Sequence, residues 1–356
     1  MTRDTTRVAT AAAAVCTLAL AAVLAPAPAR ADAGRVYTVY LSNNFNGNDW
    51  RQQMLRSVQV AATKPPLAGR VTLKINNVET TTQAQISSLN NIIREKPDAI
   101  LVDAGSGDAL NPTLERACKA GIVVISFDQV VTADCAYKVS SNFDTMAANQ
   151  AAWMAKILGG KGKVLMDRGL AGAPVSEQLE NGFKKVLANY PGIEIVGYFN
   201  GNYALGPEQA GIANLLAANP EVDGIISQAY GTGAIKALQD AGHKLVPITA
   251  AAFNGTAVTC LKVSVPCILG PNPPYLSAVA LRLALDVLDG HAPASKTVLV
   301  ETPLLTTDPV DAAYVGTATP EKIEIGKTAF ADLPPGLSLP VTPDWVEITP
   351  AEALGK

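Results

Sequence analysis

Histidine is scarce in this chain, which has only His243 and His291 in 356 residues. Each follows a glycine that is expected to stop a helix, so both are predicted to lie in turns rather than beside a nucleophile. Residues 104–107 (AGSG) resemble a nucleophile elbow only faintly, since G-x-S-x-G is not met. The turn at residues 159–164 (GGKGKV) lacks the Ser or Thr that follows lysine in a phosphate-binding loop. We therefore predict that the protein is not an enzyme, with a hydrolase as the less favoured alternative.

Basic runs and long apolar runs are also missing from most of the chain. Its 28 Lys and Arg against 31 Asp and Glu give a net charge of −3, and no basic cluster indicates a nucleic-acid partner. After residue 31, no apolar stretch reaches the length of a membrane span. The length predicts roughly two domains. The hydrophobic content of 48%, with 28 Gly and 24 Pro, is typical of a globular α/β protein.

The first 31 residues have the pattern of a secretory signal peptide. Arg3 and Arg7 give a positively charged start, residues 8–24 form an apolar core, and an A-x-A cleavage site ends at Ala31. Cys16 lies within that core, so we expect it to be removed with the signal. An export signal without a later membrane span predicts a soluble protein in the periplasm or another extracytoplasmic compartment.

Four of the five cysteines follow the predicted cleavage site, and four cysteines allow three pairings. Exported proteins favour disulfides, and near neighbours in sequence are the simplest partners. We therefore predict the bonds Cys118–Cys135 and Cys260–Cys267. A zinc site is the alternative, but neither pair has metal-ligand spacing. We expect neither a metal nor a cofactor.

Residues 96–129 predict a strand, a helix and a second strand. The apolar run 99–102 ends before a Gly-Ser-Gly turn, residues 110–120 have helical spacing, and Gly121 precedes the β-branched run 122–127. A unit of this length indicates a right-handed βαβ crossover and hence a parallel sheet. Both runs are almost entirely apolar and do not alternate with polar residues, as expected of strands that are buried on two faces.

Polar residues follow both predicted strands, with Asp103 after the first and Asp128 and Gln129 after the second. In open α/β sheets, ligands bind at such strand ends. The same pattern returns in residues 222–249, which predicts two similar lobes with a small-molecule cleft between them. One undivided α/β domain with two ordinary crossovers is the alternative.

Similar signals elsewhere predict further alternating strands and helices. The expected strands are 36–41, 71–75, 137–141, 163–166 and 193–199, and the expected helices are 50–63, 81–94, 145–158, 175–189, 207–218 and 277–288. Asp49 is the expected cap of the first helix. From residue 292 the chain is rich in Pro and Thr without a strong period, and residues 317–356 are expected to form a loosely structured, exposed tail.

Several local motifs, taken in order, resemble one known family. They are Trp50–Arg51, PDAI with LERACKAGIVVISFD, GGKGKV, Gly182–Phe183, GAIKALQDAG and Phe253–Asn254–Gly255. From about residue 36 to 290 the chain is thereby similar to the type I periplasmic sugar-binding proteins of ABC transporters, of the ribose- and galactofuranose-binding type. The resemblance implies an α/β fold of two Rossmann-like lobes with parallel sheets, joined by three hinge strands.

The resemblance also implies domain limits and partners. The first lobe is expected to hold residues 35–141 plus 269–297, the second to hold residues 142–268 plus 298–316, and residues 317–356 to form a C-terminal tail. The expected partners are a sugar or polyol-like ligand and an ABC permease in the membrane, with no nucleic acid, and the protein is expected to be a monomer. A secreted sensor or receptor component for signalling is the alternative. A repressor of this fold would carry a helix-turn-helix where this chain has an export signal.

Three positions depart from the family pattern. Gln129 stands where an arginine usually follows Asp128, and Leu179 stands where the family has a second arginine. Asn254 replaces the aspartate of an Asp-Gly pair, whereas Arg51 remains at the cleft. A hydrogen bond to a charged group contributes about 1.5–3 kcal/mol. The departures therefore imply a ligand that is less hydroxylated, more apolar, or a modified sugar or polyol.

A sugar presents hydroxyls at its edge and C–H groups on its faces. Its recognition therefore needs planar side chains together with charged and amide groups that donate and accept hydrogen bonds. The predicted ligand-binding residues are Phe45, Trp50, Arg51, Asp128, Gln129, Asn142, Tyr203, Gln228, Tyr230 and Asn254.

Overall fold

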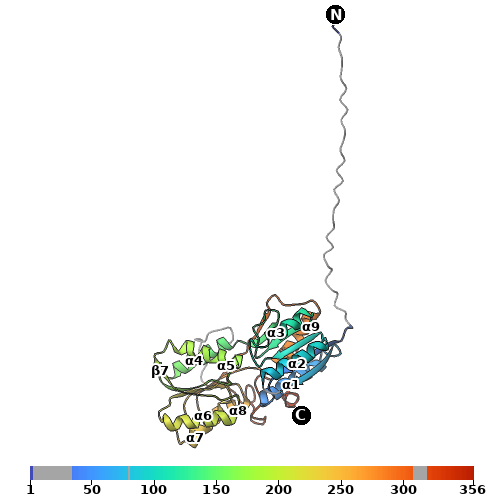
Figure 1. Cartoon of the computed structure of the whole chain (residues 1–356). Coiled ribbons are helices and arrows are strands. Elements are labelled where there is room, and N and C mark those ends of the chain that lie inside the picture. Colours follow the sequence, from blue (N-terminus) through green and yellow to red (C-terminus); the bar gives the residue numbers. More distant parts are fainter. Residues whose placement is uncertain (3–33, 79–80, 308–318) are drawn as a thin grey trace.

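The structure, a computed structural model, describes residues 1–2, 34–78, 81–307 and 319–356. Apart from its first two residues, the predicted signal peptide with Cys16 lies outside the described residues. Figure 1 shows two lobes side by side, one carrying α1, α2, α3 and α9 and the other carrying α4 to α8. In the part of the chain that is described, no helix is long and apolar enough to cross a membrane.

The first lobe is built on a six-stranded sheet, in which every neighbouring pair of strands is parallel. Its strands, in the spatial order β11-β5-β4-β3-β1-β2, are β11 (Thr297–Val300), β5 (Tyr137–Ser141), β4 (Val123–Phe127), β3 (Ala99–Asp103), β1 (Tyr37–Asn43) and β2 (Val71–Asn77). Its helices are α1 (Asp49–Thr63), α2 (Thr82–Arg94), α3 (Asn111–Lys119) and α9 (Leu276–Leu288). All of β3 is buried, as expected of a central parallel strand.

The second lobe has a seven-stranded sheet that is parallel except where β10 meets β12. Its strands, in spatial order, are β13 (Glu321–Lys322), β12 (Leu305–Thr306), β10 (Cys267–Gly270), β9 (Ile248–Ala251), β8 (Gly224–Ile226), β6 (Lys161–Asp167) and β7 (Gly192–Phe199). Its helices are α4 (Phe143–Ile157), α5 (Pro174–Leu187), α6 (Leu205–Ala218), α7 (Thr232–Asp240) and α8 (Asn254–Lys262). Two largely parallel sheets in two lobes confirm the predicted fold class.

Three crossings link the lobes in the described chain before residue 307. They lie between β5 and α4, between β10 and α9, and between β11 and β12. Strand β10 pairs with β9 through Gly270, and all of β11 pairs with β5. The sheets therefore place residues 269–270 with the second lobe and residues 298–300 with the first, a small change from the expected limits.

Both predicted disulfides are confirmed. Cys118–Cys135 joins α3 to the segment before β5, and Cys260–Cys267 joins α8 to β10. The bonded cysteines are separated by 17 and 7 residues. Each bond therefore stiffens a short stretch within one lobe and leaves the lobes free to move relative to each other.

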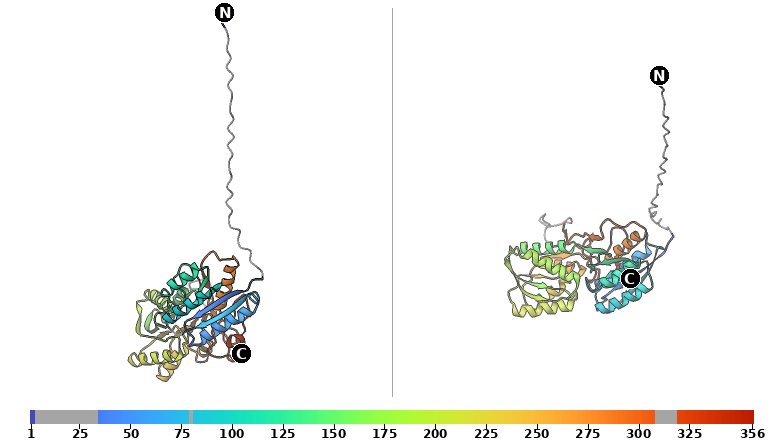
Figure 2. Two further views of the ribbon diagram at one scale, coloured as in Figure 1. Left: turned by 45° about the vertical axis from the view of Figure 1, so that its right-hand side comes forward. Right: turned by 45° about the horizontal axis from the view of Figure 1, so that its top comes forward.

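The C-terminal residues correct the expectation of an exposed tail. Residues 319–356 include β13 and the short helix α10 (Pro350–Leu354), and Leu337, Leu339 and Ile348 are buried. Helix α10 packs on α1, and Figure 2 places the C-terminus on the first lobe. The apolar residues are irregularly spaced, so they show no helical or strand period. They are nevertheless buried because they fit surfaces that the lobes already form.

Candidate functional site

A cavity lies between the two lobes, at the carboxyl ends of strands from both sheets. It encloses about 840 Å³ of empty space, including solvent at its mouth, which is within the range of roughly 300–1,000 Å³ typical of small-molecule pockets. Eight of the ten predicted ligand-binding residues line it, namely Phe45, Trp50, Arg51, Asp128, Gln129, Tyr203, Gln228 and Tyr230.

The start of α1 brings Trp50 and Arg51 to the cavity. Asn48, rather than the expected Asp49, caps this helix by accepting a hydrogen bond from the Arg51 backbone N–H at 2.9 Å. The Asn48 amide also donates to the carbonyl of Tyr203 on the second lobe at 3.4 Å. The cap therefore orients two cavity residues and contacts the opposite wall.

A buried charge cluster forms the first-lobe wall of the cavity. The Arg51 guanidinium donates to Asn43 Oδ1 at 2.9 Å, forms an ion pair with Asp103, and lies 3.8 Å from Asp128 Oδ2. Burial lowers the pKa of Arg51 to about 10, against the opposing effect of Asp128, so the guanidinium stays charged at neutral pH. Burial raises the pKa of Asp128, an effect that Arg51 opposes. The cluster offers a ligand hydroxyl a cationic donor and a carboxylate acceptor side by side.

Asn272, in the crossing between β10 and α9, joins residues of this polar wall to one another through hydrogen bonds. Its amide donates to Asp128 Oδ1 at 2.7 Å, its side-chain oxygen accepts from Ser141 Oγ at 3.0 Å, and its carbonyl accepts from Trp50 Nε1 at 2.6 Å. Asp128 itself has φ 55°, a left-handed conformation that aspartate adopts more readily than most residues. Sequence reasoning missed Asn272, although its position among prolines in residues 271–274, just after a buried strand, was an available signal.

Hydrogen-bonded side chains form the second-lobe wall. Tyr203 Oη lies 2.7 Å from Ser176 Oγ and donates to Gln228 Oε1 at 3.3 Å. The Gln228 amide donates to the carbonyls of Asp167 at 3.1 Å and Ser176 at 3.2 Å. Burial raises the pKa of Tyr203, so its phenol stays neutral at physiological pH. These bonds fix the polar atoms of the wall before a ligand arrives.

A buried carboxylate outside the cavity supports the loop that carries Gln228 and Tyr230. Glu208 accepts hydrogen bonds from the Ser227 hydroxyl and from the N–H groups of Gly231 at 2.9 Å and Gly233 at 3.0 Å. Burial raises the pKa of Glu208 to about 7, since these hydrogen bonds offset only part of the desolvation. The geometry of this loop therefore depends on a group that titrates near neutral pH.

Aromatic and apolar side chains complete the cavity. Tyr230 stacks on Phe253 with ring centroids 4.4 Å apart and an interplanar angle of 6°. Leu179 lines the cavity, so the position where the related family usually has an arginine is apolar here. Further apolar lining comes from Phe143, Met146, Val175 and Ala250.

Two predicted ligand-binding residues lie away from the cavity lining. Asn142 caps α4 by accepting from the Thr145 N–H at 3.2 Å and donates to Glu301 at 3.0 Å. The Asn254 amide donates to the Phe330 carbonyl at 2.8 Å, and its oxygen accepts from the Phe330 N–H at 2.7 Å. These hydrogen bonds hold both side chains away from the cavity. Among the described residues, no group of three His, Cys, Asp or Glu side chains could hold a metal ion.

A sequence profile for the periplasmic binding protein domain matches residues 39–292. The chain belongs to this family. The resemblance seen in the sequence is thereby confirmed. Because the family consists of binding proteins, the prediction that the chain is not an enzyme is confirmed with it.

Among curated relatives, this periplasmic binding protein is 29% identical to the xylitol-binding protein of Mycolicibacterium smegmatis over 185 residues, which cover 51% of this chain and 53% of the relative. It is 24% identical to the D-apiose import binding protein of Actinobacillus succinogenes over 172 residues, which cover 47% of this chain and 55% of the relative. The chain thus spans about half the length of these two relatives.

Solved structures extend the similarity. An ABC transporter solute-binding protein from Thermobispora bispora superposes with a TM-score of 0.68 at 27% identity, covering 76% of this chain and 85% of that one. The binding protein of the arabinose ABC transporter from Shewanella sp. ANA-3, at 21% identity, has a TM-score of 0.69 and covers 76% of this chain and 91% of its own. At 21% identity, the similarity to the arabinose-binding protein shows the fold alone.

One cavity residue of this periplasmic binding protein lies beyond the family match. Ser338, in the C-terminal residues, lines the same cavity as Arg51 and Asp128. Sequence reasoning missed it because it treated the end of the chain as an exposed tail.

Proposed function

We propose that this protein binds a pentose, a sugar alcohol or a similarly small modified sugar in the interlobe cavity and delivers it to an ABC permease. The observation that carries the proposal is the pairing of the buried Arg51–Asp128 cluster with aromatic and apolar side chains in one enclosed cavity. The relatives named for xylitol and D-apiose support this ligand class.

The two walls match two parts of such a ligand. Arg51, Asp128 and Gln129 supply donors and acceptors for hydroxyl groups, and bonds to the charged groups are the stronger ones. Trp50 and Tyr230 supply flat surfaces for C–H faces. With Leu179 and Gln129 in place of arginines, the cavity offers fewer charged donors, which favours a pentose, a five-carbon sugar alcohol or a modified sugar over a larger hexose.

Binding is coupled to a hinge motion between the lobes. A ligand that contacts Asp128 on the first lobe and Gln228 on the second favours the closed arrangement, because only that arrangement makes both contacts. A micromolar dissociation constant would correspond to a net binding free energy of about −8.2 kcal/mol, after the cost of closing the lobes. The closed form is then the one that the permease would recognise.

Uptake is favoured over signalling because one curated relative is an import binding protein and the similar protein from Thermobispora bispora belongs to an ABC transporter. The two disulfides are consistent with an extracytoplasmic location. Cleavage near Ala31 is part of the proposal, and N-terminal sequencing of the exported protein checks it.

A thermal-shift screen of the protein without its first 31 residues tests the function. The panel holds xylitol, D-arabinose, ribose, hexoses, amino acids and nucleosides. A ligand at a hundredfold excess over its dissociation constant stabilises the folded protein by about 2.7 kcal/mol. Silence across all sugars and polyols, with a response to another class, would contradict the proposal.

Asp128→Asn provides the matched variant for any ligand found. The loss of a charged acceptor should weaken binding roughly 10- to 100-fold, while the exposed Asp108→Asn should leave it unchanged. If both variants bind as the wild type does, Asp128 is not a ligand-binding residue.

A further inference from the structure

The C-terminal segment, residues 319–356, lies beyond the family match and is attached to the second lobe. The backbone N–H groups of Asn254 and Gly255 donate to the carbonyls of Leu337 at 2.8 Å and Pro335 at 2.9 Å. The Leu339 N–H donates to the Ala252 carbonyl at 2.8 Å. Together with the Asn254 side chain, these bonds hold residues 330–339 against the start of α8.

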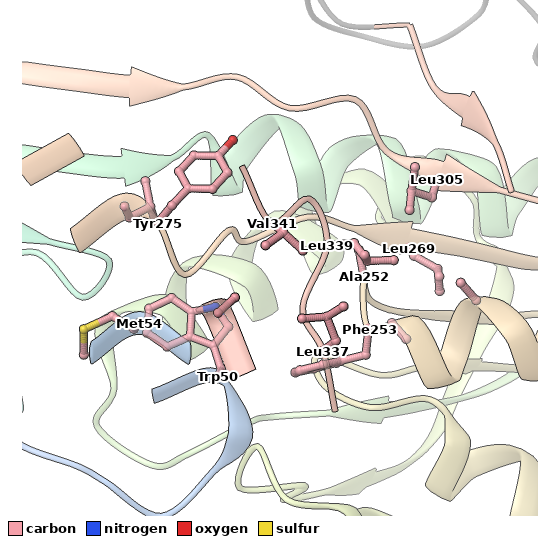
Figure 3. Packing of buried hydrophobic residues seen from close by; sticks show 14 of the residues in the cluster. Trp50, Met54, Ala252, Phe253, Leu269, Tyr275, Leu305, Leu337, Leu339 and Val341 are labelled. Carbon is pink, nitrogen blue, oxygen red and sulfur yellow. The ribbon is translucent and has the colours of Figure 1, made fainter. Parts of the chain in front are cut away.

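The same segment is also attached to the first lobe. Lys64 forms an ion pair with Glu352 at 2.7 Å, and Arg282 lies over the Trp345 ring at 5.2 Å. Figure 3 shows the apolar side chains of the segment between the lobes, with Trp50, Met54 and Tyr275 on one side, Ala252 and Phe253 on the other, and Leu337, Leu339 and Val341 in the middle. The C-terminal segment is therefore a fourth connection between the lobes, placed beside the cavity.

Ser338 stands where this connection meets the cavity. Its N–H donates to Gln53 Oε1 at 2.9 Å, and its carbonyl accepts from Gln53 Nε2 at 3.1 Å. Ser338 is 3% exposed and lines the cavity, and its hydroxyl has no hydrogen-bond partner among the described residues. A buried hydroxyl without a partner is unfavourable, and a hydroxylated ligand would supply the missing bond.

We infer that Ser338 is a ligand-binding residue supplied by the C-terminal segment, and that Gln53 is the residue that positions it. The inference rests on the proposed function for the class of ligand, a neutral compound with hydroxyl groups. Because Gln53 belongs to the first lobe and residues 330–339 are held by the second, Ser338 meets the ligand only when the lobes and the segment are together. The C-terminal segment thus contributes to ligand selection.

Calorimetric titration with xylitol compares the wild type, Ser338→Ala and Thr342→Val. Ser338→Ala should weaken binding roughly 3- to 10-fold, the effect of one neutral hydrogen bond. Its ligand-free unfolding midpoint should stay the same or rise, because the hydroxyl has no partner to lose. Thr342 donates to the Ile348 carbonyl at 2.6 Å outside the cavity lining, so Thr342→Val should lower the midpoint and leave affinity unchanged. Equal affinity in the wild type and Ser338→Ala overturns the inference and leaves the proposed function standing.

A double-variant cycle tests the role of Gln53. Gln53→Met keeps the length of the side chain and removes both bonds to the Ser338 backbone. It should weaken xylitol binding in the wild-type background and have a smaller effect in the Ser338→Ala background. Full additivity of the two effects overturns the positioning role.

A ligand-independent measurement separates this inference from the proposed function. If the wild type binds neither xylitol nor any other sugar or polyol of the panel, the proposed function fails. Ser338→Cys is then treated with methyl methanethiosulfonate under native conditions and analysed by mass spectrometry. Modification of the new thiol supports a place for residue 338 at an open cavity. Absence of modification, when the urea-unfolded variant reacts, overturns it.

Discussion

Replacing Glu208 by glutamine should remove a pH dependence from the stability of this protein. Burial raises the pKa of Glu208 from its ordinary value of 4.5 to about 7. A carboxyl with a higher pKa in the folded state binds its proton more tightly when folded. Its stabilising contribution is therefore complete below pH 4.5 and is lost as the pH rises through 7.

The size of this change in stability follows from the raised pKa of Glu208. Each unit of pKa difference corresponds to about 1.4 kcal/mol, and part of the titration lies below pH 5. Between pH 5 and 8, the wild type should therefore lose roughly 2–3 kcal/mol of unfolding free energy relative to Glu208→Gln. The unfolding free energy of Glu208→Gln should also be lower by about 1 kcal/mol at all pH values, since the amide leaves one of the backbone N–H donors without an acceptor.

Urea unfolding followed by tryptophan fluorescence at pH 5, 6, 7 and 8 measures this difference. Glu177 is exposed, so Glu177→Gln serves as the control. Its unfolding free energy should change with pH in the same way as that of the wild type. A difference between the wild type and Glu208→Gln that stays constant over this range would refute the reasoning, because the carboxyl would then titrate alike in the folded and unfolded chains.

Three further predictions concern the frame around the cavity. Replacing both cysteines of the Cys118–Cys135 bond by serine should lower the free energy of unfolding by about 3 kcal/mol. The same change at Cys260–Cys267 should lower it by about 2 kcal/mol, because the loop that this bond closes is shorter. Denaturant titrations check both values. Asn254→Ala should cost about 2–3 kcal/mol and expose the C-terminal segment to limited proteolysis, whereas persistent protease resistance would contradict its anchoring role. Arg51→Met should abolish ligand-induced thermal shifts, and an unchanged shift would exclude Arg51 from binding.

Much of the fold could be predicted because its central strands are buried on both faces. The run in β3 and the β-branched residues of β4 are apolar throughout, and a glycine marks the end of the helix between them. The repeat of that pattern in residues 222–249 indicated the second lobe. Local signals of this kind also placed Arg51 and Asp128, since one begins a helix and the other follows a strand.

The contributions of Asn272 and Ser338 depend on contacts that leave no local pattern. Asn272 lies among prolines in a lobe crossing, and Ser338 lies in a segment without a period. Asn254 misled sequence reasoning because its motif is real but its side chain binds the Phe330 backbone instead of facing the cavity. Such partners are far apart in sequence, so only the folded arrangement reveals them.

The placement of both chain ends matters for anyone who would turn this protein into an optical biosensor. Strand β1 begins at Tyr37 in the first-lobe sheet, and α10 returns the end of the chain to α1 on the same lobe. Fluorescent proteins fused to the two ends would therefore travel as one body and register little of the lobe closure. One of the pair has to be inserted into the second lobe instead, for example at the exposed residues 220–221 between α6 and β8.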